Sequence, residues 1–123
     1  MLILKESNVK RLIVCCDGTW NSAEQEDNGV SAPTNVVKIY NAIADVDSEG
    51  VRQEKYYHPG VGGEDIGPVD AVLGGAVGLG LGRHIRSAYH WLGSNYEEGD
   101  EIYLFGFSRG AFTVRSLGGM LSR

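Results

Sequence analysis

The sequence has little cysteine, little proline and no long apolar run. Its two cysteines, Cys15 and Cys16, are neighbours, so they leave no disulfide framework and no zinc motif. On a strand their side chains point to opposite faces, and we expect two small buried thiols rather than a disulfide. No apolar stretch approaches the roughly 20 residues that cross a bilayer, and the first residues do not resemble a signal peptide. These absences favour a cytoplasmic protein, or one exported by a system that needs no signal peptide.

Basic residues are also sparse. The formal net charge is −5, and no basic run or stripe is present to neutralise phosphates, so we expect no nucleic-acid partner. Glycine, in contrast, is abundant, with 18 residues in a chain of 123. The glycines stand beside apolar residues, which predicts tight turns and close backbone approaches rather than disorder.

Apolar runs and helical spacing alternate along the chain. The run Leu12–Cys16 is typical of a strand covered on both faces, and the spacing from Val36 to Ile43 predicts an amphipathic helix capped by Thr34 or Asn35. Further on, the patterns predict a strand at 51–57, a helix at 83–96, a strand at 101–105 and a helix from 109 onward. This alternation predicts an α/β fold with a mostly parallel sheet and flanking helices.

The three histidines all precede residue 100. The helix predicted at 83–96 has its apolar residues on one face, and both His84 and His90 fall off that face. They are therefore predicted to be surface histidines. His58 follows a predicted strand and could reach the edge of a site. The residues that define the apolar face are Ile85, Ala88, Tyr89, Leu92 and Tyr96.

A Gly-x-Ser-x-Gly pattern stands in the segment 102–111, IYLFGFSRGA. Ser108 lies between a predicted strand and a predicted helix, with Gly106 and Gly110 two residues to either side. This is the pattern of a nucleophile elbow, in which a strained serine stands at the tip of a sharp turn. The amide of Arg109 and the amino end of the helix would stabilise an oxyanion beside it. The alternative is a corner whose serine only caps the helix.

A second oxyanion donor is expected from a loop after another central strand. Asp17, Gly18 and Thr19 follow the first strand, and Gly18 permits a close backbone approach. The alternative, which the sequence leaves open, is a plain turn in which Asp17 caps its own loop. One carboxylate is too little for a metal site, and the sequence predicts no metal and no cofactor.

The glycine-rich stretch at 74–82, GGAVGLGLG, allows three interpretations. A phosphate cradle is disfavoured, because it lacks both the G-x-G-x-x-G spacing after a strand and a following Gly-Lys-Ser/Thr. Residues 71–81 are apolar and could touch a lipid surface or form a lid, although they are too short to span a membrane. A tightly packed loop or helix near the site is favoured.

Five ordered segments carry a family resemblance. As a set they resemble the α/β-hydrolase family of unknown-function domains typified by the catalytic domains of type VI secretion phospholipase effectors. The resemblance implies a Ser-Asp-His ester hydrolase of lipase or phospholipase type, with Ser108 as nucleophile and the Asp17–Thr19 loop at the active site. The segments are CCDGTWN (15–21), PTNVVKIYNAI (33–43), YYHPGVGG (56–63), GGAVGLGLGRHIRSAYHWL (74–92) and NYEEGDEIYLFGFSRGAFTVRSLGGML (95–121).

The family order places the acid and the histidine after the serine, yet residues 109–123 contain no Asp, Glu or His. Residues 1–123 are therefore interpreted as a single, truncated α/β-hydrolase-like catalytic domain, the N-terminal part of that fold, active only within a longer protein. The expected partners are an ester or lipid substrate, a membrane surface, and a C-terminal segment or second chain that completes the fold. A catalytically silent fragment or binding module that keeps the scaffold is the other function class left open.

Overall fold

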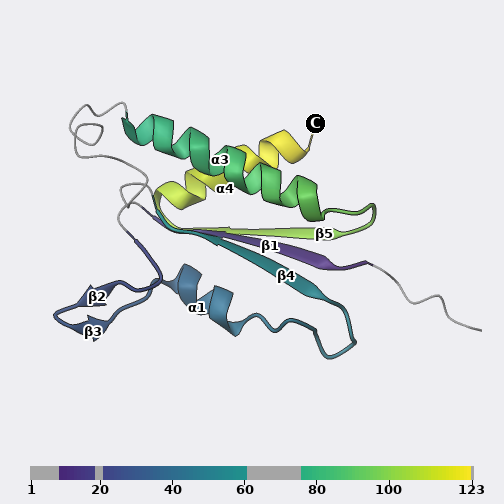
Figure 1. Cartoon of the computed structure of the whole chain (residues 1–123), viewed down its shortest axis with the longest axis horizontal. Coiled ribbons are helices and arrows are strands. Elements are labelled where there is room, and N and C mark those ends of the chain that lie inside the picture. Colours follow the sequence, from purple (N-terminus) through teal and green to yellow (C-terminus); the bar gives the residue numbers. More distant parts are fainter. Residues whose placement is uncertain (1–8, 19–20, 61–75, 123) are drawn as a thin grey trace, which may run out of the picture.

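The structure is a computed structural model that describes residues 9–18, 21–60 and 76–122. Three parallel strands form its main sheet in the order β4-β1-β5, with β1 at Arg11–Cys16, β4 at Gln53–His58 and β5 at Glu101–Gly106. Two helices, α3 (Ala76–Asn95) and α4 (Arg109–Leu121), cover one face, and α1 (Asn35–Ala42) lies on the other (Figure 1). The predicted α/β arrangement of a mostly parallel sheet with flanking helices is confirmed.

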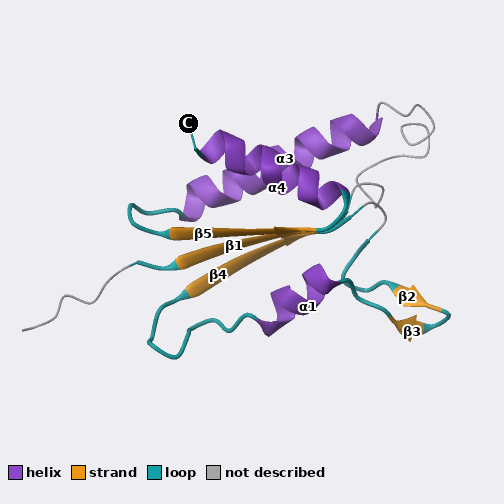
Figure 2. Cartoon of the chain, turned by 180° about the vertical axis from the view of Figure 1, so that it is seen from behind, coloured by secondary structure: helices purple, strands orange, loops and turns teal. Residues whose placement is uncertain are grey.

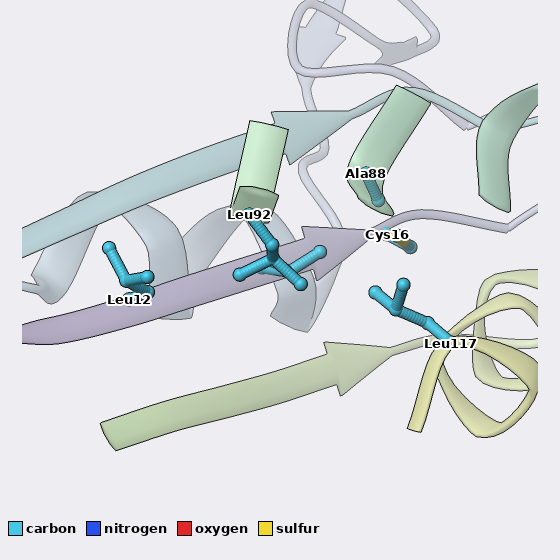
Figure 3. Close-up of a cluster of buried hydrophobic side chains, with 6 residues drawn as sticks. Leu12, Cys16, Ala88, Leu92 and Leu117 are labelled. Carbon is cyan, nitrogen blue, oxygen red and sulfur yellow. The ribbon is translucent and has the colours of Figure 1, made fainter. Parts of the chain in front are cut away.

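The central strand β1 is buried because both of its faces are covered. Leu12, Val14 and Cys16 point to the side of α3 and α4, whereas Ile13 and Cys15 pack toward α1. Figure 3 shows side chains of β1 among those of the two helices, with Leu12, Cys16, Ala88, Leu92 and Leu117 labelled. The predicted strand and the opposite orientation of the two thiols are therefore confirmed, and both cysteines are free and buried.

Helix α1 begins where the sequence predicts. The side chain of Thr34 accepts a hydrogen bond from the amide of Val37, so Thr34 is the N-cap. The predicted loop before this helix contains a short hairpin, β2 (Glu26–Asp27) and β3 (Val30–Ser31), which projects from the body of the chain in Figure 2. Its turn is Asn28-Gly29, and both residues have positive φ, as a tight hairpin turn requires.

The prediction for the buried face of α3 is partly wrong. Its sheet-facing stripe is His84, Ala88 and Leu92, whereas Tyr89 and Tyr96 are nearly half exposed. His84 is buried, with 4% of its surface exposed, which corrects the prediction that it lies on the surface. The reason is that the ring of His84 packs against the ring of His58 on β4, a contact that accommodates an imidazole among apolar side chains. His90 is exposed as predicted.

Helix α4 packs through a narrow stripe of small and apolar residues. Gly110, Thr113 and Leu117 are buried, while Phe112 and Met120 are 57% and 41% exposed. The outer face of α4 therefore exposes large apolar side chains next to Arg115, and nothing in the part of the chain that the structure describes covers them. Among the described helices, none combines the length and hydropathy needed to cross a bilayer.

Candidate active site

The three strand ends meet at one edge of the sheet. The register pairs Cys16 with both His58 and Gly106, so the loops that follow β1, β4 and β5 leave the sheet side by side. Figure 2 shows the strand ends converging beside the first turn of α4. Ligands of open parallel sheets bind at the carboxyl edge, which makes this edge the candidate site.

The turn between β5 and α4 has the geometry of a nucleophile elbow. Ser108, at its tip, has φ 56° and ψ −120°, a region that a non-glycine residue occupies only under strain. The turn is held by the Phe107 amide, which donates to the Cys16 carbonyl at 3.1 Å, and by the Gly110 amide, which donates to the Phe107 carbonyl at 2.8 Å. The strain is thus maintained by one bond to the central strand and one bond within the turn.

The two glycines of the motif are required by space. A Cβ on Gly106 would lie 2.4 Å from the Gly110 carbonyl oxygen. A Cβ on Gly110 would lie 2.2 Å from the carbonyl oxygen of Cys16 and 2.5 Å from that of Asp17. All of these neighbours are backbone atoms, so strand and helix approach each other as closely as the elbow interpretation predicts.

The alternative in which Ser108 caps the helix does not fit. Ser108 occupies the N-cap position of α4, but its side chain makes no capping hydrogen bond. The residue is exposed at the edge of the sheet. A capping serine adopts extended backbone angles and bonds the amide two or three residues on, and Ser108 does neither.

Asp17 organises the loop after β1. The carboxylate is buried and bonded at both oxygens: Oδ1 accepts from the amide of Gly18 at 3.0 Å, and Oδ2 accepts from Thr34 Oγ1 at 2.9 Å and Tyr57 Oη at 2.7 Å. The Asp17 side chain therefore caps its own loop through the Gly18 amide, as the alternative interpretation of a plain turn predicts. The Gly18 amide is occupied by this bond, and Thr19 lies outside the described residues.

Sequence reasoning missed Thr34 and Tyr57 as partners of Asp17. Burial, and then the hydrogen bond to the Asp17 carboxylate, raise the pKa of Tyr57, so its hydroxyl stays protonated and remains a donor. The only signal in the sequence was position: Tyr57 is one residue before the end of its strand, at the edge where Asp17 follows β1.

Removing the Tyr57 hydroxyl should weaken the fold measurably. Tyr57→Phe takes one donor from a buried carboxylate, and bonds to charged groups contribute about 1.5–3 kcal/mol to the free energy of unfolding. Urea denaturation measures this loss. Tyr103→Phe is the matched control, because the Tyr103 hydroxyl donates to the exposed Glu101 carboxylate and should contribute little. Equal losses in the two variants would contradict the organising role of Asp17.

Gly18 connects this loop to Ser108. A Cβ on Gly18 would lie 3.0 Å from Ser108 Cβ and 2.9 Å from Phe107 Cδ2. The backbone after β1 therefore touches the tip of the turn after β5. Of the predicted site residues, the structure brings together Asp17, Gly18 and Ser108, with Arg109 next in sequence as the first residue of α4.

A family model matches almost the whole chain. Residues 10–123 match the model of the type VI secretion Tle1-like phospholipase effector catalytic domain. The chain belongs to this family. The resemblance stated from the sequence is thereby confirmed.

The chain is also similar to an uncharacterized protein of Saccharomyces cerevisiae, YEL023C, at 40% identity over 129 residues. That alignment covers 95% of this chain but only 18% of the yeast protein, so the chain spans less than a fifth of that relative's length. No solved structure matches the chain at a significant level.

The two cysteines near the site edge of this Tle1-like domain do not compete with Ser108 as nucleophiles. Burial raises the pKa of Cys15 to about 11 and that of Cys16 to about 12, so both thiols are neutral and poor nucleophiles at physiological pH. Within the described ranges, no group of three or more His, Cys, Asp or Glu residues is placed to hold a metal ion.

The rings of His58 and His84 pack against each other in a tilted arrangement. The two ring centroids are 3.8 Å apart, and His58 Nδ1 lies 2.9 Å from the Pro59 carbonyl oxygen. Strand β1 lies between β4 and β5, so His58, at the end of β4, and Ser108, after β5, belong to strands that are not neighbours. The ring contact was not predicted, because nothing local links positions 58 and 84.

Proposed function

We propose that Ser108 is the nucleophile of a serine ester hydrolase that acts on lipid esters, as a phospholipase does. The observation that carries the proposal is the state of Ser108: exposed, uncapped and strained at a sharp strand–helix turn. Family membership supports a phospholipase type of activity. Strain of this kind costs about 1–3 kcal/mol and is characteristic of functional sites.

The proposed reaction follows the acyl-enzyme route. A histidine deprotonates Ser108 Oγ, which forms a bond to the ester carbonyl carbon while the carbonyl π pair moves onto oxygen. Collapse of this intermediate expels the alcohol, which takes the proton back from the histidine. Water then attacks the acyl-enzyme, and the acid is released with Ser108 restored. The histidine and its aspartate are proposed to lie downstream of residue 123, as the family order implies.

The oxyanion is proposed to bind at the start of α4. No acceptor in the described part of the chain bonds the Arg109 amide, and the helix dipole places partial positive charge there. A second donor is proposed at the amide of Thr19, because the Gly18 amide is already bonded to Asp17. Gly18 then contributes the close approach that brings this loop to Ser108.

A catalytically silent module is the weaker alternative. A scaffold that binds or only supports structure gains nothing from a serine at φ 56°, because glycine occupies the same turn without the strain. The hydrogen bonds of the turn hold Ser108 in a strained conformation that exposes its hydroxyl and lowers the stability of the fold. This argument favours a hydrolase.

The outer side of β5 and α4 is proposed as the surface where the rest of the fold docks. Among the described residues, β5 pairs only with β1. Phe112 and Met120 of α4 are 57% and 41% exposed, and Tyr103, on the other face of β5, is 42% exposed. A segment of a longer chain, or a second chain, would cover this edge. A lipid surface is the other partner proposed for the protein, and export through a type VI secretion route fits the family.

Hydrolysis of phospholipid vesicles tests the function. The full-length protein is incubated with vesicles of phosphatidylethanolamine and phosphatidylglycerol, and fatty acids and lysophospholipids are quantified by mass spectrometry. The proposal predicts release that is linear in enzyme. Folded protein that releases no acid from vesicles or from short p-nitrophenyl esters would overturn it.

A further inference from the structure

An aromatic side chain stands directly beside the predicted nucleophile. Phe107 precedes Ser108 and is 49% exposed at the carboxyl edge of the sheet. Single exposed apolar side chains are common, so exposure alone argues nothing. What distinguishes Phe107 is its position. A Cβ built on Gly18 would meet Phe107 Cδ2 at 2.9 Å and Ser108 Cβ at 3.0 Å, so the ring, the serine and the loop after β1 meet at one point.

The backbone of Phe107 is fixed to the sheet. Its amide donates to Cys16 and its carbonyl accepts from the Gly110 amide, at 3.1 and 2.8 Å. The ring is therefore attached to the same turn that strains Ser108, and the point from which its side chain projects is set by the fold. A side chain anchored at a fixed point beside a nucleophile can discriminate between substrates.

We propose that Phe107 is the acyl-chain contact of the site and sets its preference for long chains. This inference rests on the proposed function. An ester carbonyl in position for attack lies about 3–3.5 Å from Ser108 Oγ. Because Phe107 precedes Ser108 and its ring reaches the same Gly18 backbone as Ser108 Cβ, the acyl chain on that carbon is proposed to run along the exposed part of the ring. Each methylene that the ring removes from water improves binding about fourfold.

The proposal predicts a chain-length effect. On p-nitrophenyl esters from acetate to decanoate, all dispersed in the same detergent, kcat/KM of the full-length protein should rise with chain length. Phe107→Ala should lower the decanoate-to-acetate ratio of kcat/KM about tenfold, and Phe107→Leu should restore part of it. Tyr96→Ala is the matched control, since Tyr96 is 46% exposed but precedes the amino end of β5 at the opposite edge. It should leave the ratio unchanged.

A purely structural ring gives a different result. If Phe107 only covers the Gly18 loop, its removal lowers kcat/KM equally for every chain length, and that outcome overturns the proposal. The same holds if kcat/KM of the wild-type protein does not change with chain length, or if Phe107→Leu lowers the decanoate-to-acetate ratio as much as Phe107→Ala. Wild-type protein that hydrolyses none of the esters would instead refute the proposed function, which separates the two failures.

Discussion

Replacing Ser108 by glycine is expected to abolish ester hydrolysis and at the same time to raise the melting temperature. At φ 56° and ψ −120° a side chain strains the backbone by about 1–3 kcal/mol, and glycine removes that strain. Part of the gain is offset, because glycine loses about 0.5–1 kcal/mol more conformational entropy on folding. The expected net stabilisation is about 0.5–2 kcal/mol. Loss of a triad nucleophile typically lowers turnover about 10⁶-fold.

Thermal unfolding and the rate on a short ester measure the two effects in one variant. Ser116→Gly is the control, because Ser116 lies within α4, where glycine costs roughly 0.5 kcal/mol and no strain is released. It should lower the melting temperature slightly and keep the activity. A Ser108→Gly protein that is less stable than wild type, or that still hydrolyses the ester, would contradict the elbow.

Substituting Gly110 by alanine is expected to have the largest effect on stability. The new Cβ would lie 2.2 Å from the Cys16 carbonyl oxygen, a backbone atom of the central strand, so α4 must move away from β1. Overpacking that forces backbone shifts typically costs about 1–3 kcal/mol and occasionally more, and a clash with a backbone atom that cannot rotate away puts this change at the upper end. We expect little soluble folded protein, and a strongly lowered urea midpoint for what remains.

Gly119→Ala provides the comparison on the same helix. A Cβ at Gly119 meets nothing within 4 Å, so this change should be neutral or stabilise α4 by up to about 1 kcal/mol. If Gly110→Ala unfolds at the same urea concentration as Gly119→Ala, the close approach of helix and strand is refuted.

The features predicted correctly from the sequence are those that neighbouring residues determine. A run such as Leu12–Cys16 has to be covered on both faces, and the structure places it at the centre of the sheet. Gly106, Ser108 and Gly110 specify a sharp turn by their own spacing. Thr34 caps α1 because the helix begins immediately after it.

The features that were missed depend on contacts far apart in the chain. Asp17 is bonded by side chains 17 and 40 residues away, and no local pattern indicates which hydroxyls reach it. The buried face of α3 was assigned from apolar residues alone. His84 lies on that face because the ring of His58, at the end of strand β4, packs against it. A polar residue can be buried when the tertiary fold supplies a partner for it. The spacing of apolar residues along a helix does not reveal such a partner.

Covalent labelling of Ser108 is the most direct test of the central claim. The full-length, folded protein is treated with a fluorophosphonate probe, and the modified residue is located by peptide mass spectrometry. The proposed function predicts a single adduct on the peptide that contains Ser108, prevented by prior heat denaturation and absent from Ser108→Gly. Labelling of another serine, or no labelling of folded protein that carries the downstream sequence, would contradict it.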